Sequence, residues 1–157
     1  MSAFDQKIQE QIASLLGSQH LTVLSTQREG QPYSSLMAFA FTPDLVNIAV
    51  ATGKSTRKYQ NLMQESRVSL LVDNRSNNES DFHAAMAVTA IGKAQLIEHQ
   101  ERPEYEGIYL QRHPYLEKFL ASPTTAFVKI AVSHYVLVSR FQDVMEYRLG
   151  DESDLFS

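Results

Sequence analysis

A seven-residue segment, Thr52-Gly53-Lys54-Ser55-Thr56-Arg57-Lys58, gathers three cations, three hydroxyl groups and one glycine. It lies between two apolar stretches, residues 48–51 and 68–72, whose β-branched and aliphatic side chains are typical of buried strands. The polar residues that follow the segment predict a short helix, so the segment lies at a helix start. A helix start offers unpaired backbone N–H groups and a positive dipole end, and it binds anions, most naturally a phosphate.

Four residues of this segment are candidate anion ligands. Ser55 or Thr56 can cap the helix, because both side chains accept a hydrogen bond from the first turn. Arg57 and Lys58 add formal charge at the same place. The alternative is a solvated turn followed by a polar helix, since cation-rich turns are common on protein surfaces.

The composition limits the kinds of partner. The chain has 157 residues, 43% hydrophobic and 20% charged, which indicates one globular domain with a substantial core. A net charge of −4 disfavours nucleic-acid binding, because contacts to the nucleic-acid backbone need a basic surface. No apolar run of about 18 residues is present, so we expect no membrane span. The chain lacks cysteine, which excludes disulfides and thiolate metal sites and fits a cytoplasmic location.

The spacing of apolar residues predicts a mainly β protein with short helices. We expect strands at residues 20–26, 32–41, 45–51, 67–73, 82–98, 125–139 and 143–148, and helices at 4–17, 56–64, 104–112 and 115–120. For the long strand at 82–98 the alternative is a helical or bent start. Gly92 interrupts one strand, where glycine usually marks a bulge or a sharp bend at a barrel corner. Hairpin-linked strands favour a small closed barrel, because closure removes exposed edges. The expected fold is a six- to seven-stranded antiparallel split β-barrel, one domain over residues 1–157 with an acidic tail from about residue 150.

The order of four motifs carries a family resemblance. After a strand–turn–strand unit at residues 20–41 come Ala51-Thr52, Ser55-Thr56-Arg57-Lys58, the strand that starts at Arg67 and Ala90-Ile91-Gly92-Lys93-Ala94. This order resembles the pyridoxamine 5'-phosphate oxidase-like FMN-binding split barrels, over roughly residues 10–140.

The resemblance implies a homodimer with two FMN sites at its interface. It assigns the FMN phosphate to the Ser/Thr-Arg-Lys turn, and the flavin to the preceding strand and to the second strand. The residues so assigned are Ser55, Thr56, Arg57 and Lys58 for the phosphate, and Ala51, Thr52, Ser35, Leu36, Met37 and Ala38 for the flavin. A deazaflavin would present a phosphate to the same residues, so it is an alternative ligand.

The sequence also departs from the oxidase that gives the family its name. Where that oxidase has an arginine and a lysine on the second strand, this chain has Ser35 and Ala40. A flavin-contacting glutamine is replaced by Ala87, and the Arg-x-His near the C-terminus has no counterpart. We therefore expect a protein other than that oxidase, with reduced FMN affinity.

Haem is another possible ligand. Residues 109–114, the strand from Phe127 and residues 136–141 resemble the haem-utilisation branch of the same superfamily. Neutral imidazole is the commonest protein ligand of haem iron, and His83 and His113 are the candidates among the five histidines. His113 precedes a proline, so a hydrogen bond to a helix end explains it equally well.

Three functions fit these residues. The first is an FMN-dependent oxidoreductase, for which the flavin supplies the redox chemistry, so no catalytic residue is assigned. The others are a haem-binding or haem-degrading protein and a non-enzymatic flavin-binding module. The substrate and the electron donor stay open. No metal site is expected, because the acidic residues Asp81, Glu98, Glu101, Glu104 and Glu106 follow no ligand spacing.

Overall fold

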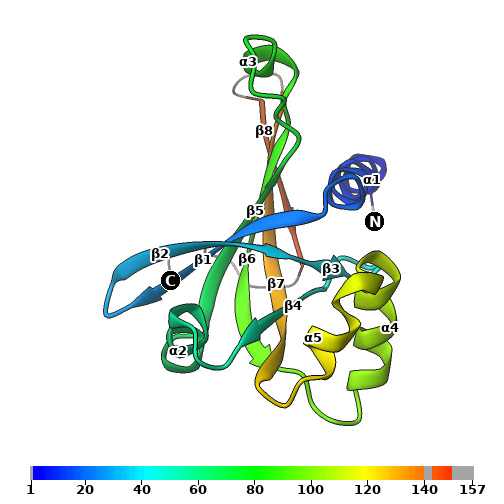
Figure 1. The fold of residues 1–157 in the computed structure, drawn as a ribbon. Helices are drawn as coiled ribbons and strands as arrows, with labels where there is room; N and C mark the ends of the chain where they lie inside the picture. The colour runs from blue at the N-terminus through cyan, green and yellow to red at the C-terminus, as the bar shows by residue number, and fades with distance from the viewer. Residues whose placement is uncertain (1, 140–142, 150–157) are drawn as a thin grey trace.

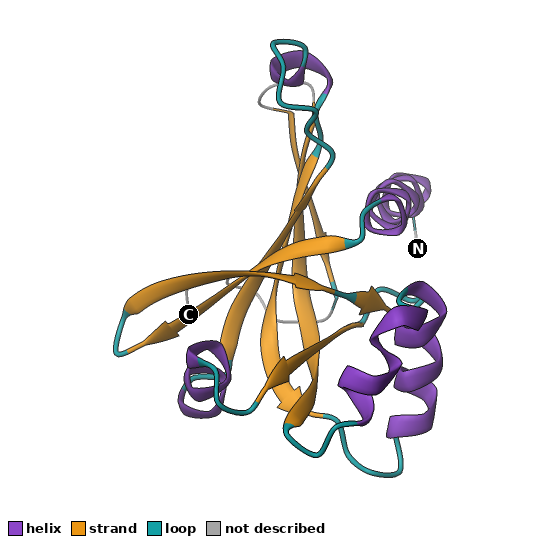
Figure 2. Ribbon diagram, viewed as in Figure 1, coloured by secondary structure: helices purple, strands orange, loops and turns teal. Residues whose placement is uncertain are grey.

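The computed structural model describes residues 2–139 and 143–149; the acidic tail expected from residue 150 lies outside the described residues. Within that part of the chain the sheet has eight strands, drawn in Figure 2. They are β1 (Leu21–Arg28), β2 (Gln31–Ala38), β3 (Ala40–Phe41), β4 (Asn47–Gly53), β5 (Arg67–Asp73), β6 (Ala87–Leu96), β7 (Thr125–Ser139) and β8 (Asp143–Arg148). The bounds of β7 and β8 are those expected from the sequence.

Five helices and one 3-10 turn accompany the sheet. They are α1 (Ala3–Ser18), α2 (Arg57–Gln64), α3 (Asp81–Ala84), α4 (Arg102–Arg112), the 3-10 turn η1 (Pro114–Leu116) and α5 (Glu117–Ala121). The apolar stripe that predicts the first helix is the buried face of α1, formed by Ile8, Ile12, Leu15 and Leu16. None of these described helices has the length and apolar character needed to cross a membrane.

The strands form one antiparallel sheet in the order β2-β1-β5-β6-β7-β4-β3, with β8 paired to β7. The two ends of this order, β2 and β3, are consecutive in the chain and separated by Phe39 alone. The sheet therefore curls back on itself, as Figure 1 shows. β2 lies beside β4, but no ladder joins them in the described residues, so the barrel is split along this line. The expected split-barrel class is confirmed.

Phe39 changes the expected strand count. The segment expected as one strand, residues 32–41, is broken there into β2, paired with β1, and β3, paired with β4. The Phe39 side chain is fully buried in the main core, which fixes the break. Its carbonyl oxygen accepts a hydrogen bond from a side chain of the helical region rather than from a strand.

Strand β4 is buried on both faces and separates two apolar clusters. Ile48 and Val50 face the main core inside the barrel. Ala49 and Ala51 face a smaller cluster that α4, α5 and Phe127 cover. The alternation of branched and small side chains along β4 thus lets helices pack closely on its outer face. The strand that leads into the cation-rich segment is therefore held on both sides.

Gly92 lies at the bulge expected from the sequence. The register between β6 and β7 shifts between Ile91 and Gly92. A Cβ atom at Gly92 would lie 2.3 Å from the carbonyl oxygen of Ala131, so only glycine fits this close approach. The bulge bends β6 where the sheet curls.

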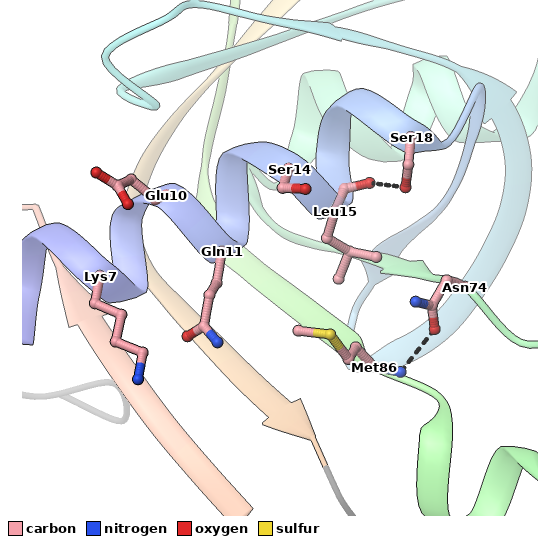
Figure 3. A pocket seen from close by; sticks show the side chains of 8 residues that line it. All are labelled: Lys7, Glu10, Gln11, Ser14, Leu15, Ser18, Asn74 and Met86. Carbon is pink, nitrogen blue, oxygen red and sulfur yellow. Dashed lines mark hydrogen bonds between the residues drawn. The ribbon is translucent and has the colours of Figure 1, made fainter.

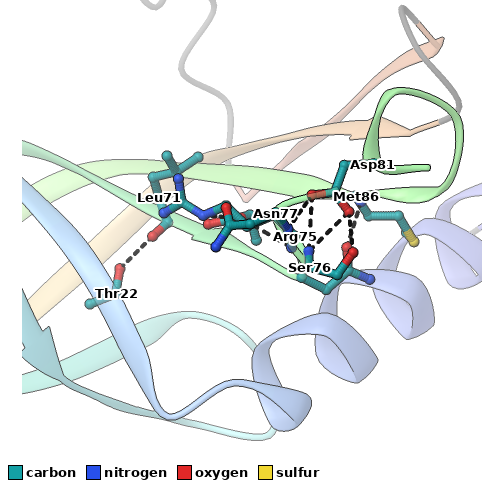
Figure 4. A network of polar contacts seen from close by, with 9 residues as sticks. Thr22, Leu71, Arg75, Ser76, Asn77, Asp81 and Met86 are labelled. Atoms are coloured by element: carbon teal, nitrogen blue, oxygen red, sulfur yellow. Dashed lines mark hydrogen bonds and ion pairs between the residues drawn. The ribbon is translucent and has the colours of Figure 1, made fainter. Parts of the chain in front are cut away.

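The segment expected as a long strand at residues 82–98 is helical at its start, which is the alternative that the sequence left open. Residues 81–84 form α3, at the tip of a ribbon that projects beyond the barrel, and the strand begins only at Ala87 (Figure 1). The Asp81 carboxylate accepts hydrogen bonds from the Ser76 N–H and hydroxyl and from the Asn77 N–H (Figure 4). These donors hold the pKa of Asp81 below its usual range and close the polar loop before α3.

Candidate functional site

The turn between β4 and α2 is organised by Thr56, one of the two caps expected from the sequence. Its hydroxyl oxygen accepts a hydrogen bond from the Tyr59 N–H (3.2 Å) and donates to the Gly53 carbonyl (2.8 Å). The Thr52 hydroxyl oxygen lies 3.0 Å from the Thr56 hydroxyl oxygen and completes its hydrogen bonding. The Thr56 side chain is thus used within the turn, where it fixes the helix start.

The first turn of α2 leaves several donors free. In the part of the chain that the structure describes, the backbone N–H groups of Arg57 and Lys58 have no acceptor, as expected at a helix start. Their side chains form no ion pair with a described carboxylate, and the Ser55 hydroxyl has no hydrogen-bond partner there. Arg57 and Ser55 are exposed, and Lys58 is half-buried. The turn therefore presents backbone donors, a hydroxyl and two unneutralised cations together.

The third cation of the segment has a different role. The Lys54 ammonium donates to the Pro123 carbonyl (2.9 Å), and the Lys54 N–H donates to the Thr124 carbonyl (2.8 Å). Both acceptors lie in the turn between α5 and β7. Lys54 therefore ties the β4–α2 turn to the helical region, and only Arg57 and Lys58 remain available at the helix start.

The two strands predicted to contact a flavin lie side by side along the split. β2 lies against β4, and Ala40 pairs with Ala49 directly after the break at Phe39, which places the end of β2 next to the end of β4. Met37, Ala51 and Thr52 are buried. Strand β2 pairs with β1 alone in the described residues, so alternate backbone groups along it face the split without a ladder partner.

The remaining predicted residues of β2 differ in exposure. Ser35 and Ala38 are half-buried, and the Leu36 side chain is 66% exposed on the outer face of the sheet. The structure thus places residues 35–38 and 51–58 along the split between β2 and β4. The unpaired backbone edge of β2 faces the split, whereas the Leu36 side chain does not.

Three residues that were not predicted from the sequence attach the β1–β2 hairpin to α2. The buried Asn61 amide donates to the Thr26 hydroxyl (3.0 Å). The Arg57 guanidinium carbon lies 5.5 Å from the centre of the Tyr33 ring. Thr26 and Tyr33 face each other across the hairpin. A signal for this pairing exists, because Asn61 lies four positions after Arg57 on one helix face.

Two departures from the oxidase are built into the packing. Ala40, at the position of the family's lysine, is fully buried in the cluster of Tyr105 and Tyr109. A lysine there would place an unpaired charge in an apolar environment. Ala87 is half-buried on β6, opposite Asp73 and Val138.

His113 has a structural role. Its side chain is fully buried, and its Nε2–H donates to the Phe39 carbonyl (2.7 Å), while Nδ1 lies 3.4 Å from the Tyr115 hydroxyl. Burial lowers the pKa of His113, with further lowering by Arg112 and His20, although the bond to Phe39 opposes the shift. His113 is therefore a neutral imidazole that satisfies the carbonyl at the break between β2 and β3.

His83 lies far from His113. It is exposed in α3 at the tip of the projecting ribbon, whereas His113 follows α4 at the opposite end of the sheet (Figure 1). The structure does not bring the two candidate haem ligands together.

The acidic residues considered as metal ligands are dispersed. Among the described residues no group of three or more histidine and acidic side chains could hold an ion. Glu101 accepts a hydrogen bond from the Lys129 ammonium (2.6 Å), which lowers the pKa of Glu101. Glu106 pairs with Arg102 (2.5 Å).

A hollow of about 570 Å³ lies away from the cation-rich turn, between α1 and the base of the β5–β6 ribbon (Figure 3). Its lining consists of Lys7, Glu10, Gln11, Ser14, Leu15, Ser18, Asn74 and Met86. None of these residues is among those predicted to bind a ligand. The Asn74 side chain accepts a hydrogen bond from the Met86 N–H (2.7 Å) and thus braces the base of the ribbon.

The family model for pyridoxamine 5'-phosphate oxidase matches residues 8–139, from α1 to the end of β7. The chain belongs to this family. A Schizosaccharomyces pombe protein named as a pyridoxamine 5'-phosphate oxidase homolog is 34% identical over 93 residues, which are 53% of this chain and 49% of that protein. The chain therefore matches about half the length of this curated relative.

Solved structures share the fold at low identity. A heme binding protein from Mycobacterium smegmatis superposes with a TM-score of 0.80 at 16% identity, over 89% of this chain and 57% of that one. A FAD-binding protein from Mesorhizobium loti superposes with a TM-score of 0.65 at 13% identity, over 87% and 94%. At these identities the likeness concerns the fold alone.

Proposed function

We propose that this chain binds FMN along the split between β2 and β4, with the phosphate on the first turn of α2. The observation that carries the proposal is the pair of unneutralised cations, Arg57 and Lys58, beside two free backbone N–H groups. A phosphate dianion requires such charge-assisted donors, and the Ser55 hydroxyl adds one more. The residues present therefore fit the phosphate of FMN.

The proposed activity is that of a flavin-dependent oxidoreductase. Bound FMN would supply the redox chemistry, whereas the chain would bind it, orient it and exclude water. The free edge of β2 at residues 35–38 would hydrogen-bond the flavin ring through backbone groups, and the small side chains of Ala38 and Ala51 leave the adjacent surface flat.

Pyridoxamine 5'-phosphate is not the proposed substrate. A second doubly charged phosphate would require further cations beside the flavin, and Ser35, Ala40 and Ala87 supply none. The burial of Ala40 also leaves no room for a lysine at that position. The proposed substrate is therefore a molecule without that phosphate.

A homodimer is part of the proposal. Leu36, Val23 and Leu71 lie in one row across the outer face of the sheet, and Leu21 is next to it. Leu36 is 66% and Leu21 49% exposed, and Val144 on the same face is 61% exposed. A second copy would bury this apolar face beside the split. Sedimentation at micromolar concentration tests this, and a monomer would contradict it.

The phosphate assignment is tested by FMN titration of the purified protein and of an Arg57→Ala/Lys58→Ala variant. We expect flavin absorbance in the wild type and an affinity loss of at least about 100-fold in the variant, because two charge-assisted contacts disappear. The matched control is Lys7→Ala/Arg75→Ala, which removes the same charge on α1 and after β5, away from the turn. Full FMN loading of the first variant would refute the assignment. A parallel titration with a phosphorylated deazaflavin shows which of the two ligands binds more tightly.

Haem is the second candidate ligand, supported by the fold shared with the Mycobacterium smegmatis heme binding protein. Of the two candidate histidines, exposed His83 is the one with an accessible imidazole. Haem titration should then give a Soret band that shifts in His83→Ala, and a titration without a Soret band rules haem out. If FMN binds but reduced nicotinamide gives no turnover, the non-enzymatic flavin module is favoured over the enzyme.

A further inference from the structure

Arg57 is held in place by an aromatic ring and not by a carboxylate. Its guanidinium carbon lies 5.5 Å from the centre of the Tyr33 ring, within the range of a cation–π contact. No described carboxylate pairs with Arg57. The Tyr33 side chain is 38% exposed, so solvent reaches both partners and the guanidinium donors stay available.

The position of Tyr33 relative to α2 is fixed by a second contact. Tyr33 faces Thr26 across the hairpin, and the Thr26 hydroxyl accepts a buried hydrogen bond from Asn61. Asn61 is only 2% exposed, so water does not compete for this bond. Arg57 and Asn61 lie one helical turn apart. The β1–β2 hairpin therefore contacts α2 at two points one turn apart, through the buried hydrogen bond of Asn61 and through the exposed contact of Arg57 with Tyr33.

The other cations of the segment lack this arrangement. Lys54 is bonded to the Pro123 carbonyl, away from the helix start. Lys58 has no aromatic partner among the described residues. Arg57 alone combines free donors, a position beside the open helix start and a defined neighbour that restrains its side chain.

We propose that Tyr33 is a positioning residue, which holds Arg57 at the open first turn of α2 and so sets the preference of the site for a phosphorylated flavin over riboflavin. The inference rests on the proposed function, because the phosphate is the group that Arg57 would meet. A flexible arginine loses rotamer freedom when it binds an anion, and a restrained one has less to lose. Tyr33 therefore strengthens phosphate binding without touching the ligand.

The experiment compares Tyr33→Leu with Tyr33→Phe in titrations with FMN and with riboflavin. The leucine variant removes the aromatic face and should weaken FMN binding about two- to fivefold while riboflavin binding stays unchanged. The phenylalanine variant keeps the ring and should retain wild-type affinity for both. Because Tyr33 is partly exposed, all variants should fold, which thermal unfolding verifies.

A double-mutant cycle separates positioning from a direct role. In an Arg57→Ala background, Tyr33→Leu should have no further effect on FMN affinity, because the residue that it positions is gone. An equal loss for FMN and riboflavin, or the same loss with and without Arg57, would overturn the inference.

The outcomes also separate this inference from the proposed function. If Arg57→Ala abolishes the preference for FMN over riboflavin but Tyr33→Leu does not change it, the phosphate assignment stands and the role of Tyr33 is refuted. If the wild-type protein has no preference for FMN over riboflavin, the phosphate assignment is itself wrong, and the inference falls with it.

Discussion

Two arginines at opposite ends of two helices show how one residue type serves the fold in one place and a ligand in the other. Arg112, the last residue of α4, donates to the Leu16 carbonyl (3.3 Å) and to the Gln19 carbonyl at the C-terminal end of α1. Its guanidinium also stacks over Phe39 and Phe41, at 5.0 and 5.3 Å. Burial lowers the pKa of Arg112. Arg57 stacks on one exposed ring and has no such acceptors.

The difference lies in which helix end each cation meets. The C-terminal end of α1 presents free carbonyls and the negative end of the dipole, so Arg112 satisfies it within the chain. The N-terminal end of α2 has the opposite polarity, and the chain places cations there instead of acids. The C-terminal end of α1 is thus satisfied by a cation of the same chain, whereas the N-terminal end of α2 is open to an anion from outside the chain.

The largest effect should come from removing the charge of Arg112, compared with the same change at Arg57. Arg112→Met keeps the length of the side chain but leaves the α1 carbonyls without their cation, so we expect the free energy of unfolding to fall by about 2–3 kcal/mol. Arg57→Met should change it by less than about 0.5 kcal/mol, since the side chain is exposed. Urea unfolding of both variants measures the contrast. Equal losses would show that Arg57 is a structural residue too.

A smaller effect should come from His113, next to Arg112. Because the folded-state pKa of His113 lies below the unfolded value, the unfolded chain takes up the proton first as the pH falls. The stability from His113 is therefore present above about pH 6.5 and is lost as the pH falls through the folded-state pKa. His113→Leu leaves the buried Phe39 carbonyl unpaired and should lower the free energy of unfolding by about 1–2 kcal/mol at pH 8.

The pH dependence of this difference is the decisive part. Urea unfolding at pH 8, 6 and 5 should show the gap between wild type and His113→Leu narrowing at low pH, since the other titrating groups are common to both. A difference in free energy of unfolding that widens as the pH falls would mean that His113 is protonated in the folded protein. Its charge would then be stabilised by a group other than the Phe39 carbonyl.

Local signals predicted most of the fold. The stripe of α1, the alternation of β7 and β8, the cap at Thr56 and the bulge at Gly92 each depend on residues close in sequence. The break at Phe39 was not predicted, because residues 36–41 form an unbroken apolar run with no turn residue and the break depends on His113 from a distant segment. Residues 82–98 were expected as a long strand with a helical or bent start as the alternative, and the hydrogen bonds of Asp81 to the preceding loop favour the helix.

The candidate site, too, was predicted only where its residues lie close together in the sequence. Arg57 and Lys58 were found because they are adjacent to a cap in one short segment. Tyr33 and Asn61 were missed because their contacts cross from one element to another, and Lys54 was grouped with the other cations although Pro123 takes its ammonium. A single sequence shows which groups could bind an anion, but it does not show which of them the fold has already used.

The smallest of these effects should come from Thr56, whose hydroxyl belongs to the fold although it lies in the site. Thr56→Val keeps the shape and removes the cap of α2, so we expect about 1 kcal/mol less stability. FMN affinity should fall less than in the Arg57→Ala/Lys58→Ala variant, because the valine variant keeps both cations and disorders only the turn that presents them. Thr56→Ser restores the hydroxyl and should recover both properties. If Thr56→Val weakens FMN binding as strongly as the loss of the two cations does, the Thr56 hydroxyl contacts the phosphate directly. Thr56 would then be a ligand residue in addition to the helix cap that its hydrogen bonds show.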